Sequence, residues 1–319
     1  MDLRIFVAAI LFFSVAGCSG ADATGDEADV KAGHALRIEA TSALSLSEVS
    51  GLVRSVHGGI LAVGDSEPAV VAFDLDAKAR ADNETRFDLS KLPVSGEDGS
   101  QWEAVATDGT GRVFVMSENP SGVYAFDPAI GKLLHTITLE VLPGSEAFAS
   151  WSKNLNSRGE GMVLLRGGHI LVAIEKDPPA LAEFGPADSQ AGGYEPGAAI
   201  GSATFPLPKT ASSKMVLLHT WSIKSGDRAS LKDISELAVG PDERLYLMSQ
   251  ESRDIVRVER ALGADEFMVD VKSVHSLPSE IRAPEGLVIL DDRRVVVADD
   301  THDGDDNLFV LSALPAVTE

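Results

Sequence analysis

The sequence predicts an all-β fold, a five-bladed β-propeller, and three observations support this class. A short motif recurs five times along the chain. Apolar runs bounded by turn residues follow every copy in the same order. A further apolar run separates most successive copies. Self-similarity of this kind means one supersecondary unit copied several times, each copy burying its faces against its neighbours.

The motif ends on an apolar residue in every copy. Its copies are Ser50-Gly51-Leu52, Glu103-Ala104-Val105, Glu160-Gly161-Met162, Ser235-Glu236-Leu237 and Glu285-Gly286-Leu287. Nine residues after the apolar member lies the middle of a β-like run, and four residues further on lies an acid or its amide. These last positions are Asp65, Glu118, Glu175, Gln250 and Asp300.

Each repeat is expected to hold four strands. The first strand contains the end of the motif, a turn with Gly or Asp leads to the second, and a polar loop leads to the third. We expect the second strands at 60–63, 113–116, 170–174, 245–248 and 295–298. We expect fourth strands at 85–89, 133–139, 215–223 and 267–274. Four strands per unit, repeated around an axis, make a β-propeller.

The fifth repeat lacks a fourth strand of its own. We expect residues 36–39, ahead of the first repeat, to supply it and close the ring. The third interval between motifs is the longest and holds an insertion at about 187–213, rich in Gly, Pro, Ala and Ser, which we expect to be a surface loop. A sixth, degenerate blade is the alternative, although this segment lacks the motif.

The first 35 residues are expected to lie outside the propeller. Ile5 to Phe13 is an apolar run too short to span a bilayer and typical of a signal peptide. Val15-Ala16-Gly17-Cys18 resembles the bacterial lipobox, whose cysteine carries lipid. We predict a lipoprotein signal peptide at 1–17, a lipid anchor on Cys18, a flexible tether at 18–35 and the propeller at 36–314. The anchor would hold the protein at a membrane of the bacterial cell envelope.

The composition argues against nucleic acid as a partner. The chain has 49 acidic and 27 basic residues and a formal net charge of -22, whereas phosphate binding needs a basic surface. The negative charge permits cations as ligands, and it also keeps a protein soluble. We expect a monomer.

The acids of the repeats are expected to converge at one mouth of the central channel. The start of the first strand and the loop between strands two and three lie at the same end of an antiparallel sheet. The predicted ligands of a metal ion there are Glu103, Glu160, Glu285, Asp65, Glu118, Glu175 and Asp300. Crowded carboxylates repel unless protons or a cation neutralise them, and Ca²⁺ prefers many oxygen ligands. The alternative is that these acids are solvated or accept hydrogen bonds from the backbone of adjacent blades.

Enzymatic motifs are scarce, and no catalytic residue is predicted. The chain has no GxSxG, P-loop, HExxH or CxxC pattern. The acidic run 299–307 resembles a Ca²⁺ loop, but Val310 stands where an EF-hand needs Glu, so a solvated turn is favoured over a second Ca²⁺ site.

Several segments resemble the SdiA-regulated family of bacterial envelope proteins. The matching segments are Asn156-Ser157-Arg158-Gly159-Glu160-Gly161-Met162 with Val172-Ala173-Ile174-Glu175-Lys176-Asp177-Pro178, Asp233-Ile234-Ser235-Glu236-Leu237 with Ser249-Gln250-Glu251-Ser252-Arg253, and Ala283-Pro284-Glu285-Gly286-Leu287 with Asn307-Leu308-Phe309. The resemblance spans about residues 36 to 312, and the family is similar to phytase-like propellers with acidic, Ca²⁺-binding channels.

The resemblance implies a periplasmic Ca²⁺-binding propeller that senses or scaffolds, with a small-molecule or protein ligand at the channel mouth. The residues that match the pattern of the family directly, and to which its possible Ca²⁺ role would apply, are Glu160, Glu175, Asp233, Ser235 and Glu285. Glu236 stands where the pattern has Gly, and Gln250 replaces an acid, which would weaken cation binding in the fourth repeat. The alternative function is a metal-dependent hydrolase of phosphoric or carboxylic esters. However, neither the first positions of the motifs nor the acidic positions 65, 118, 175, 250 and 300 contain a Lys or Arg that could hold a phosphate. A purely structural interaction propeller is the third reading.

Overall fold

The computed structural model describes residues 35–90, 101–118, 121–129, 131–143, 151, 158–223, 231–301 and 306–316. The chain divides into two compact units, Met1–Val30 and Lys31–Glu319, and every described residue belongs to the second. The predicted signal peptide and Cys18 lie outside the described residues. No helix in the described ranges combines the length and the hydrophobicity that a membrane crossing requires.

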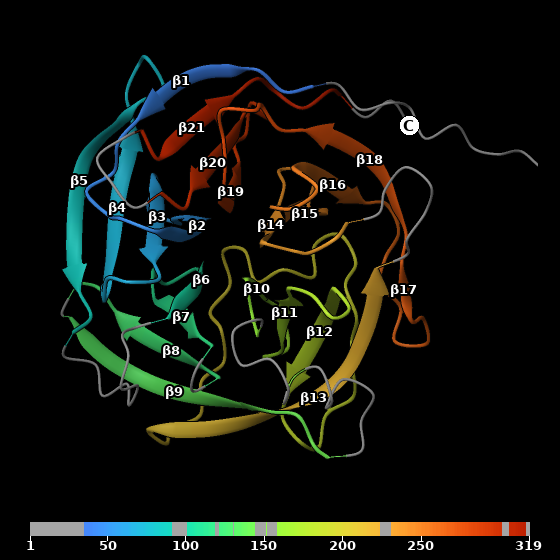
Figure 1. The fold of residues 1–319 in the computed structure, drawn as a ribbon. Helices are drawn as coiled ribbons and strands as arrows, with labels where there is room; N and C mark the ends of the chain where they lie inside the picture. Colours follow the sequence, from blue (N-terminus) through green and yellow to red (C-terminus); the bar gives the residue numbers. More distant parts are fainter. Residues whose placement is uncertain are drawn as a thin grey trace, which may run out of the picture. The chain divides into compact units, whose positions relative to one another are not determined.

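The described strands form five four-stranded units, called blades here, arranged around a common axis (Figure 1). The innermost strands are β2 (Val49–Arg54), β6 (Trp102–Thr107), β10 (Gly161–Leu164), β14 (Glu236–Val239) and β19 (Pro284–Ile289). The second strands are β3 (Ile60–Gly64), β7 (Val113–Ser117), β11 (Ile170–Ile174), β15 (Leu245–Ser249) and β20 (Val295–Asp299). The third strands are β4 (Ala69–Leu75), β8 (Gly122–Asp127), β12 (Ala180–Gly185), β16 (Asp254–Val258) and β21 (Leu308–Leu311). The outermost strands are β5 (Ala81–Asp88), β9 (Lys132–Glu140), β13 (Ser212–Ile223), β18 (Val271–Ser276) and β1 (Ile38–Ser42).

The all-β propeller prediction is confirmed, and the ring closes as expected. Strand β1 from the beginning of the described chain pairs antiparallel with β21 from its end, so it completes the fifth blade. The second and third blades are also joined at their outer edges, because β9 and β13 pair in parallel. A short strand, β17 (Met268–Val269), pairs with the far end of β13.

The core lies between the blades rather than at the axis. Buried aliphatic and aromatic side chains form five clusters, and each cluster is shared by two neighbouring blades. Each innermost strand also contacts the innermost strand of the next blade around the whole ring. Trp102 belongs to one of these clusters, where its ring meets Tyr124 edge-on at 5.3 Å. Burial between blades therefore stabilises the ring as a closed unit.

Most residues of the insertion between β12 and β13 are exposed, as expected of a surface loop, but a few buried apolar residues anchor it. Tyr194, Ile200 and Phe205 are at most 5% exposed. Phe205 packs against Phe114 of the second blade, with ring centroids 5.3 Å apart. The small and polar residues that dominate this segment form its turns, whereas these few apolar residues anchor it.

Candidate functional site

A β-bulge lies at the motif of each blade and explains its composition. In three blades the register shifts between Val49 and Gly51, between Trp102 and Ala104, and between Pro284 and Gly286. In the other two blades, one residue of the second strand lies opposite two residues of the motif. Ala173 lies opposite both Glu160 and Gly161, and Met248 lies opposite both Ser235 and Glu236. A bulge re-aims the side chain it carries and rotates the strand beyond it. The bulge at the motif therefore directs side chains and backbone N–H groups of each innermost strand toward the channel.

The two serines at the first motif position connect neighbouring blades. The hydroxyl of Ser50 donates to the carbonyl of Trp102 in the next blade. The hydroxyl of Ser235 donates to the carbonyl of Pro284, at 2.7 Å, also in the next blade. These serines are structural. Asp233, carried over from the family resemblance, is structural too, because it is fully buried and accepts from the Ser249 hydroxyl and the Glu251 N–H.

The glutamates at the same motif position behave differently, because they repel one another. Burial raises the pKa of Glu103 well above its ordinary value, and the charges of Glu118, Asp65, Glu285 and Asp300 raise it further. Burial raises the pKa of Glu285 to about 9, with Asp300 and Asp65 again contributing. These carboxyl groups come from different blades and lie within electrostatic range of each other.

Glu160 belongs to the same cluster. Burial, followed by the charges of Glu103, Glu118 and Glu175, raises its pKa well above the usual range. The Glu118 carboxyl is hydrogen-bonded to that of Glu160 and accepts the N–H of Arg158 at 2.8 Å, yet burial raises its pKa to about 7.

Asp65, Glu175 and Asp300 lie around this core of the cluster. Burial and the charge of Glu48 raise the pKa of Asp65. Glu175 is paired with Lys176, whose own pKa that contact raises. The structure thus brings all seven predicted residues to one end of the channel, and we call them the acidic mouth.

Little positive charge compensates the acidic mouth. The guanidinium of Arg158 is directed to the carbonyl of Trp151 and the hydroxyl of Ser121 rather than to a carboxylate. The described part of the chain contains no group of three or more His, Cys, Asp or Glu side chains arranged to hold a metal ion. The donors are the hard oxygens that Ca²⁺ prefers, but they are not drawn together as one direct set of ligands.

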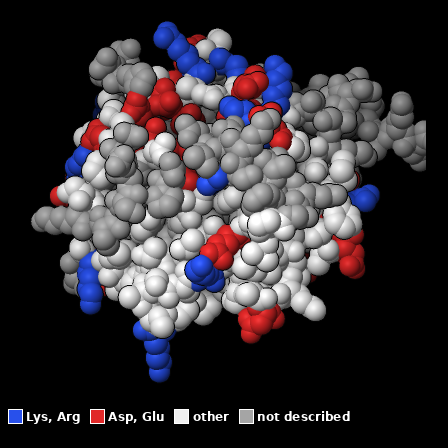
Figure 2. All heavy atoms as spheres, turned by 60° about the horizontal axis from the view of Figure 1, so that its bottom comes forward, with Lys and Arg blue, Asp and Glu red and all other residues white. Residues whose placement is uncertain are grey.

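Acidity is not spread evenly over the exterior. On the face shown in Figure 2, acidic and basic side chains lie close together at the upper edge, and the rest of the described surface is largely uncharged.

The acidic run 299–307 is partly structural. The side chain of Asn307 accepts the Leu44 N–H at 2.7 Å and donates to the Leu46 carbonyl at 2.8 Å. Residues 302–305 of that run lie outside the described residues.

Glu236 links three innermost strands across the channel, a role that the sequence did not predict. Its side chain is 2% exposed. Its carboxyl group accepts the backbone N–H of Leu237 at 2.8 Å and that of Leu52, in the first blade, at 3.3 Å. The N–H of Leu287, in the fifth blade, also donates to it. Burial raises its pKa well above the ordinary value, so the group holds its proton to higher pH. One side chain thus satisfies N–H groups of three innermost strands.

The space for Glu236 comes from its equivalents in the other repeats. The middle motif residue is Gly51, Ala104, Gly161 or Gly286 in the other four blades. A Cβ on Gly161 would lie 2.7 Å from Oε1 of Glu236 and even closer to the Leu237 backbone, so only glycine fits there. The sequence alone could have pointed to Glu236, because it is the one long residue at a motif position that holds Gly or Ala in the other four repeats.

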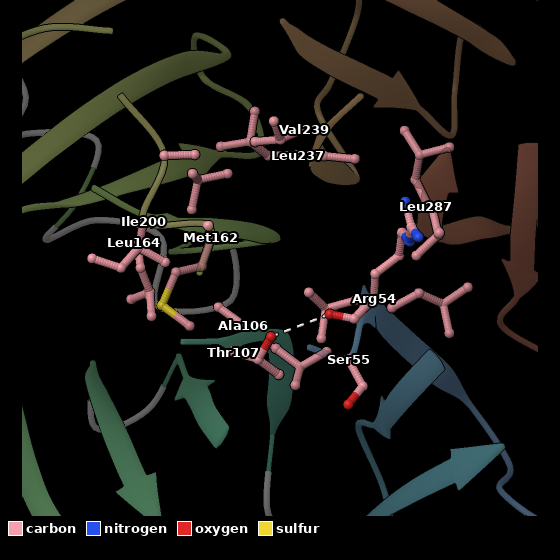
Figure 3. A pocket seen from close by; sticks show the side chains of 18 of the residues that line it. Arg54, Ser55, Ala106, Thr107, Met162, Leu164, Ile200, Leu237, Val239 and Leu287 are labelled. Carbon is pink, nitrogen blue, oxygen red and sulfur yellow. Dashed lines mark hydrogen bonds between the residues drawn. The ribbon is translucent and has the colours of Figure 1, made fainter. Parts of the chain in front are cut away.

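A second cavity opens at the end of the channel opposite the acidic mouth, and we call it the apolar chamber (Figure 3). Its volume is about 420 Å³, and all five innermost strands line it beyond the bulges. The labelled aliphatic side chains of Met162, Leu164, Leu237 and Leu287 surround the open centre in Figure 3. At the rim, the Thr107 hydroxyl donates to the Arg54 carbonyl at 3.1 Å.

The raised pKa values of the acidic mouth predict an unusual pH dependence of stability. Glu118 and Glu285 have an ordinary pKa of 4.5 when unfolded and pKa values of about 7 and about 9 when folded. The folded state therefore binds more protons in this window, and the free energy of unfolding falls as pH rises from about 4.5 toward 9. Thermal unfolding in the presence of a chelator measures this.

The variant Glu285→Gln should flatten that slope and raise the melting temperature at pH 8. Glu39→Gln is the control, because Glu39 is exposed on β1 and its removal changes the net charge equally. Equal slopes in both variants would contradict the assignment of the effect to the acidic mouth.

Comparison with solved structures identifies the class of fold. Glutaminyl cyclase from Myxococcus xanthus is 13% identical, with a TM-score of 0.50 over 87% of this chain and 96% of that chain. Aldose sugar dehydrogenase from Streptomyces coelicolor, in its PQQ-bound form, is 12% identical, with a TM-score of 0.46 over 87% and 97%. Virginiamycin B lyase from Staphylococcus aureus is 12% identical, with a TM-score of 0.38 over 88% and 74%. The similarity to glutaminyl cyclase shows the fold alone, and together with the closed ring of blades it identifies the protein as a β-propeller.

The family follows from the sequence itself. A family model described as "Phytase-like: Esterase-like activity of phytase" matches residues 45–302, which is well over half of the chain. The protein therefore belongs to the phytase-like family, and the resemblance is confirmed at the level of a phytase-like β-propeller. No curated protein matches the sequence.

Proposed function

We propose that this phytase-like propeller binds a divalent cation, Ca²⁺, at the acidic mouth and acts in sensing or scaffolding at the cell envelope. The observation that carries the proposal is that Glu103, Glu160 and Glu285 come from three blades and that burial, and then the charges of neighbouring carboxylates, raises the pKa of each. A cation would remove this repulsion and displace the protons. A small-molecule or protein ligand would then contact the cation at the mouth.

The residues proposed to hold Ca²⁺ are those three glutamates with Asp65, Glu118, Glu175 and Asp300. Ca²⁺ takes six to eight oxygen ligands and accepts water among them. Because the described carboxyl groups are spaced more widely than a direct set of ligands, water molecules would complete the coordination. The ion would supply charge neutralisation and a point of attachment for an anionic or carbonyl oxygen of the partner.

The experiment is thermal unfolding with and without Ca²⁺. Binding to the folded state alone raises stability by RT ln(1 + [L]/Kd), which is about 2.7 kcal/mol at a hundredfold excess over Kd. We expect Ca²⁺ to raise the melting temperature at pH 8, and the variant Glu103→Gln, Glu160→Gln, Glu285→Gln to lose this response. Glu39→Gln should keep it. A wild-type protein indifferent to millimolar-range Ca²⁺ would overturn the proposal.

A hydrolase of phosphoric or carboxylic esters is the second candidate. The description of the family model and the hydrogen-bonded carboxyl pair Glu118–Glu160 favour it, since one protonated and one ionised carboxyl can act as acid and base. The test is a panel of both ester classes with Ca²⁺ present, comparing wild type with Glu160→Gln. Turnover that survives this substitution unchanged would argue that the pair is not the catalytic centre.

The proposed location depends on the lipid anchor and on the closer resemblance to the SdiA-regulated family. Both are supported by sequence patterns, namely the lipobox ending in Cys18 and the repeat segments around Glu160, Ser235 and Glu285. Metabolic labelling with a radioactive fatty acid should mark the wild-type protein but not Cys18→Ser. Label retained by Cys18→Ser would exclude this anchor.

A further inference from the structure

We propose that the apolar chamber binds an amphiphilic anion, a molecule with an aliphatic body and one carboxylate group. The chamber is separate from the acidic mouth and has the size of a small-ligand pocket, since such pockets are roughly 300–1,000 Å³. Its volume of about 420 Å³ is bounded by strands of all five blades.

The inner end of the chamber is closed. Leu52, Leu237 and Leu287 line it, and their N–H groups all donate to the carboxyl group of Glu236, which lies on the side of the acidic mouth. Because each of these three N–H groups has its acceptor there, none of them is available to the body of a ligand in the chamber. A ligand would therefore enter from the opposite end and stop at the layer of leucines.

The lining selects an apolar body. Nearly all described residues that form the walls carry aliphatic side chains, as Leu164 and Val239 do in Figure 3. Burying aliphatic surface contributes about 25 cal/mol per Å².

The rim selects an anion. Among the described residues that line the chamber, Arg54 is the one that carries charge, although the protein as a whole has a net charge of -22. Its guanidinium pairs with Asp291, and the two side chains are 45% and 77% exposed. Exposed ion pairs stabilise by only about 0.2–1 kcal/mol. Exchange of Asp291 for the carboxylate of a ligand therefore costs little, and a two-point contact with the guanidinium is retained.

The insertion of the third blade makes the chamber a built feature rather than a by-product of the ring. Ala199, Ile200 and Gly201 form part of its wall. The Ile200 N–H donates to the Leu164 carbonyl at 2.8 Å, so the insertion is fixed to the innermost strand β10. Further along, the Phe205 N–H donates to Asp108 of the second blade at 2.9 Å. The insertion thus runs across the end of two blades and covers one side of the opening.

Isothermal titration calorimetry with decanoate tests the proposal, with 1-decanol as the uncharged analogue. We expect saturable binding of decanoate, about tenfold tighter than decanol, which is the value of one charge-assisted contact of about 1.4 kcal/mol. Arg54→Met should weaken decanoate to the level of decanol and leave decanol unchanged. Val239→Phe should weaken both, because the larger ring occupies the chamber.

Two controls keep the result interpretable. Arg80→Met removes an arginine from a similar exposed ion pair, with Asp76, away from the chamber, and should leave decanoate binding intact. The melting temperature of Val239→Phe shows whether the variant is folded. The proposal is overturned if wild type shows no saturable heat with decanoate, or if Arg54→Met and a folded Val239→Phe bind it as wild type does.

Discussion

Replacing Glu236 by leucine is expected to lower the free energy of unfolding by roughly 3–9 kcal/mol, because three buried N–H groups lose their acceptor at about 1–3 kcal/mol each. These groups belong to Leu52, Leu237 and Leu287 on three innermost strands. Leucine has a similar volume, so the loss measures hydrogen bonding rather than packing. Chemical denaturation at neutral pH gives the value.

Two companion variants separate the causes. Glu236→Gln keeps a carbonyl acceptor and resembles the protonated acid, so we expect a loss of about 1 kcal/mol. Glu236→Gly copies the residue of three other repeats and opens the channel to water, which can satisfy the N–H groups, so its loss should lie between the other two. A leucine variant as stable as wild type would show that these hydrogen bonds are not what holds the axis together.

Replacing Asp108 by alanine is expected to lower the free energy of unfolding by about 3–5 kcal/mol, the usual effect of breaking a buried ion pair. Asp108 is fully buried and accepts from the Phe205 N–H, from Thr110 and from the guanidinium of Arg112. These contacts lower its pKa against the effect of burial, so its stabilisation is complete at neutral pH and fades only as pH falls below about 3.8.

Asp76→Ala is the matched control for this prediction. Asp76 makes the same pattern of bonds in a turn of the first blade, to the N–H groups of Lys78 and Arg80 and to the Arg80 side chain. It lies at the surface and holds no other segment, so its loss should cost far less than the loss of Asp108. Comparable losses in the two variants would mean that Asp108 does not fasten the insertion.

The inner strands of the propeller could be read from the sequence, whereas the outer ones could be read only in part. The second strands lie within a residue of the predicted ranges, because both of their faces are buried and their apolar runs are continuous. In contrast, β5 begins at Ala81 rather than at 85, since most of its residues are exposed and give no apolar signal. The closing strand β1 lies two residues later than expected for the same reason.

The repeated motif was enough to predict the acidic mouth, but it did not predict how the rest of the channel is built. Equivalent positions in a closed ring must meet at one end, so Glu103, Glu160 and Glu285 could be placed together without coordinates. Glu236 was interpreted only as a departure that weakens cation binding, because the sequence does not show that bulges aim the N–H groups of neighbouring blades at one point. The composition of the insertion indicated a surface loop, but it did not show which few residues, such as Phe205, anchor this loop.

The pairing of β1 with β21 sets the order in which a newly made chain can be completed. Residues 38–42 are made long before the strand that pairs with them, at 308–311. The fifth blade therefore stays incomplete until residues 308–311 have been made, and until then the edges of β1 and β20 are unprotected. A chain released before Leu308 would keep that gap permanently.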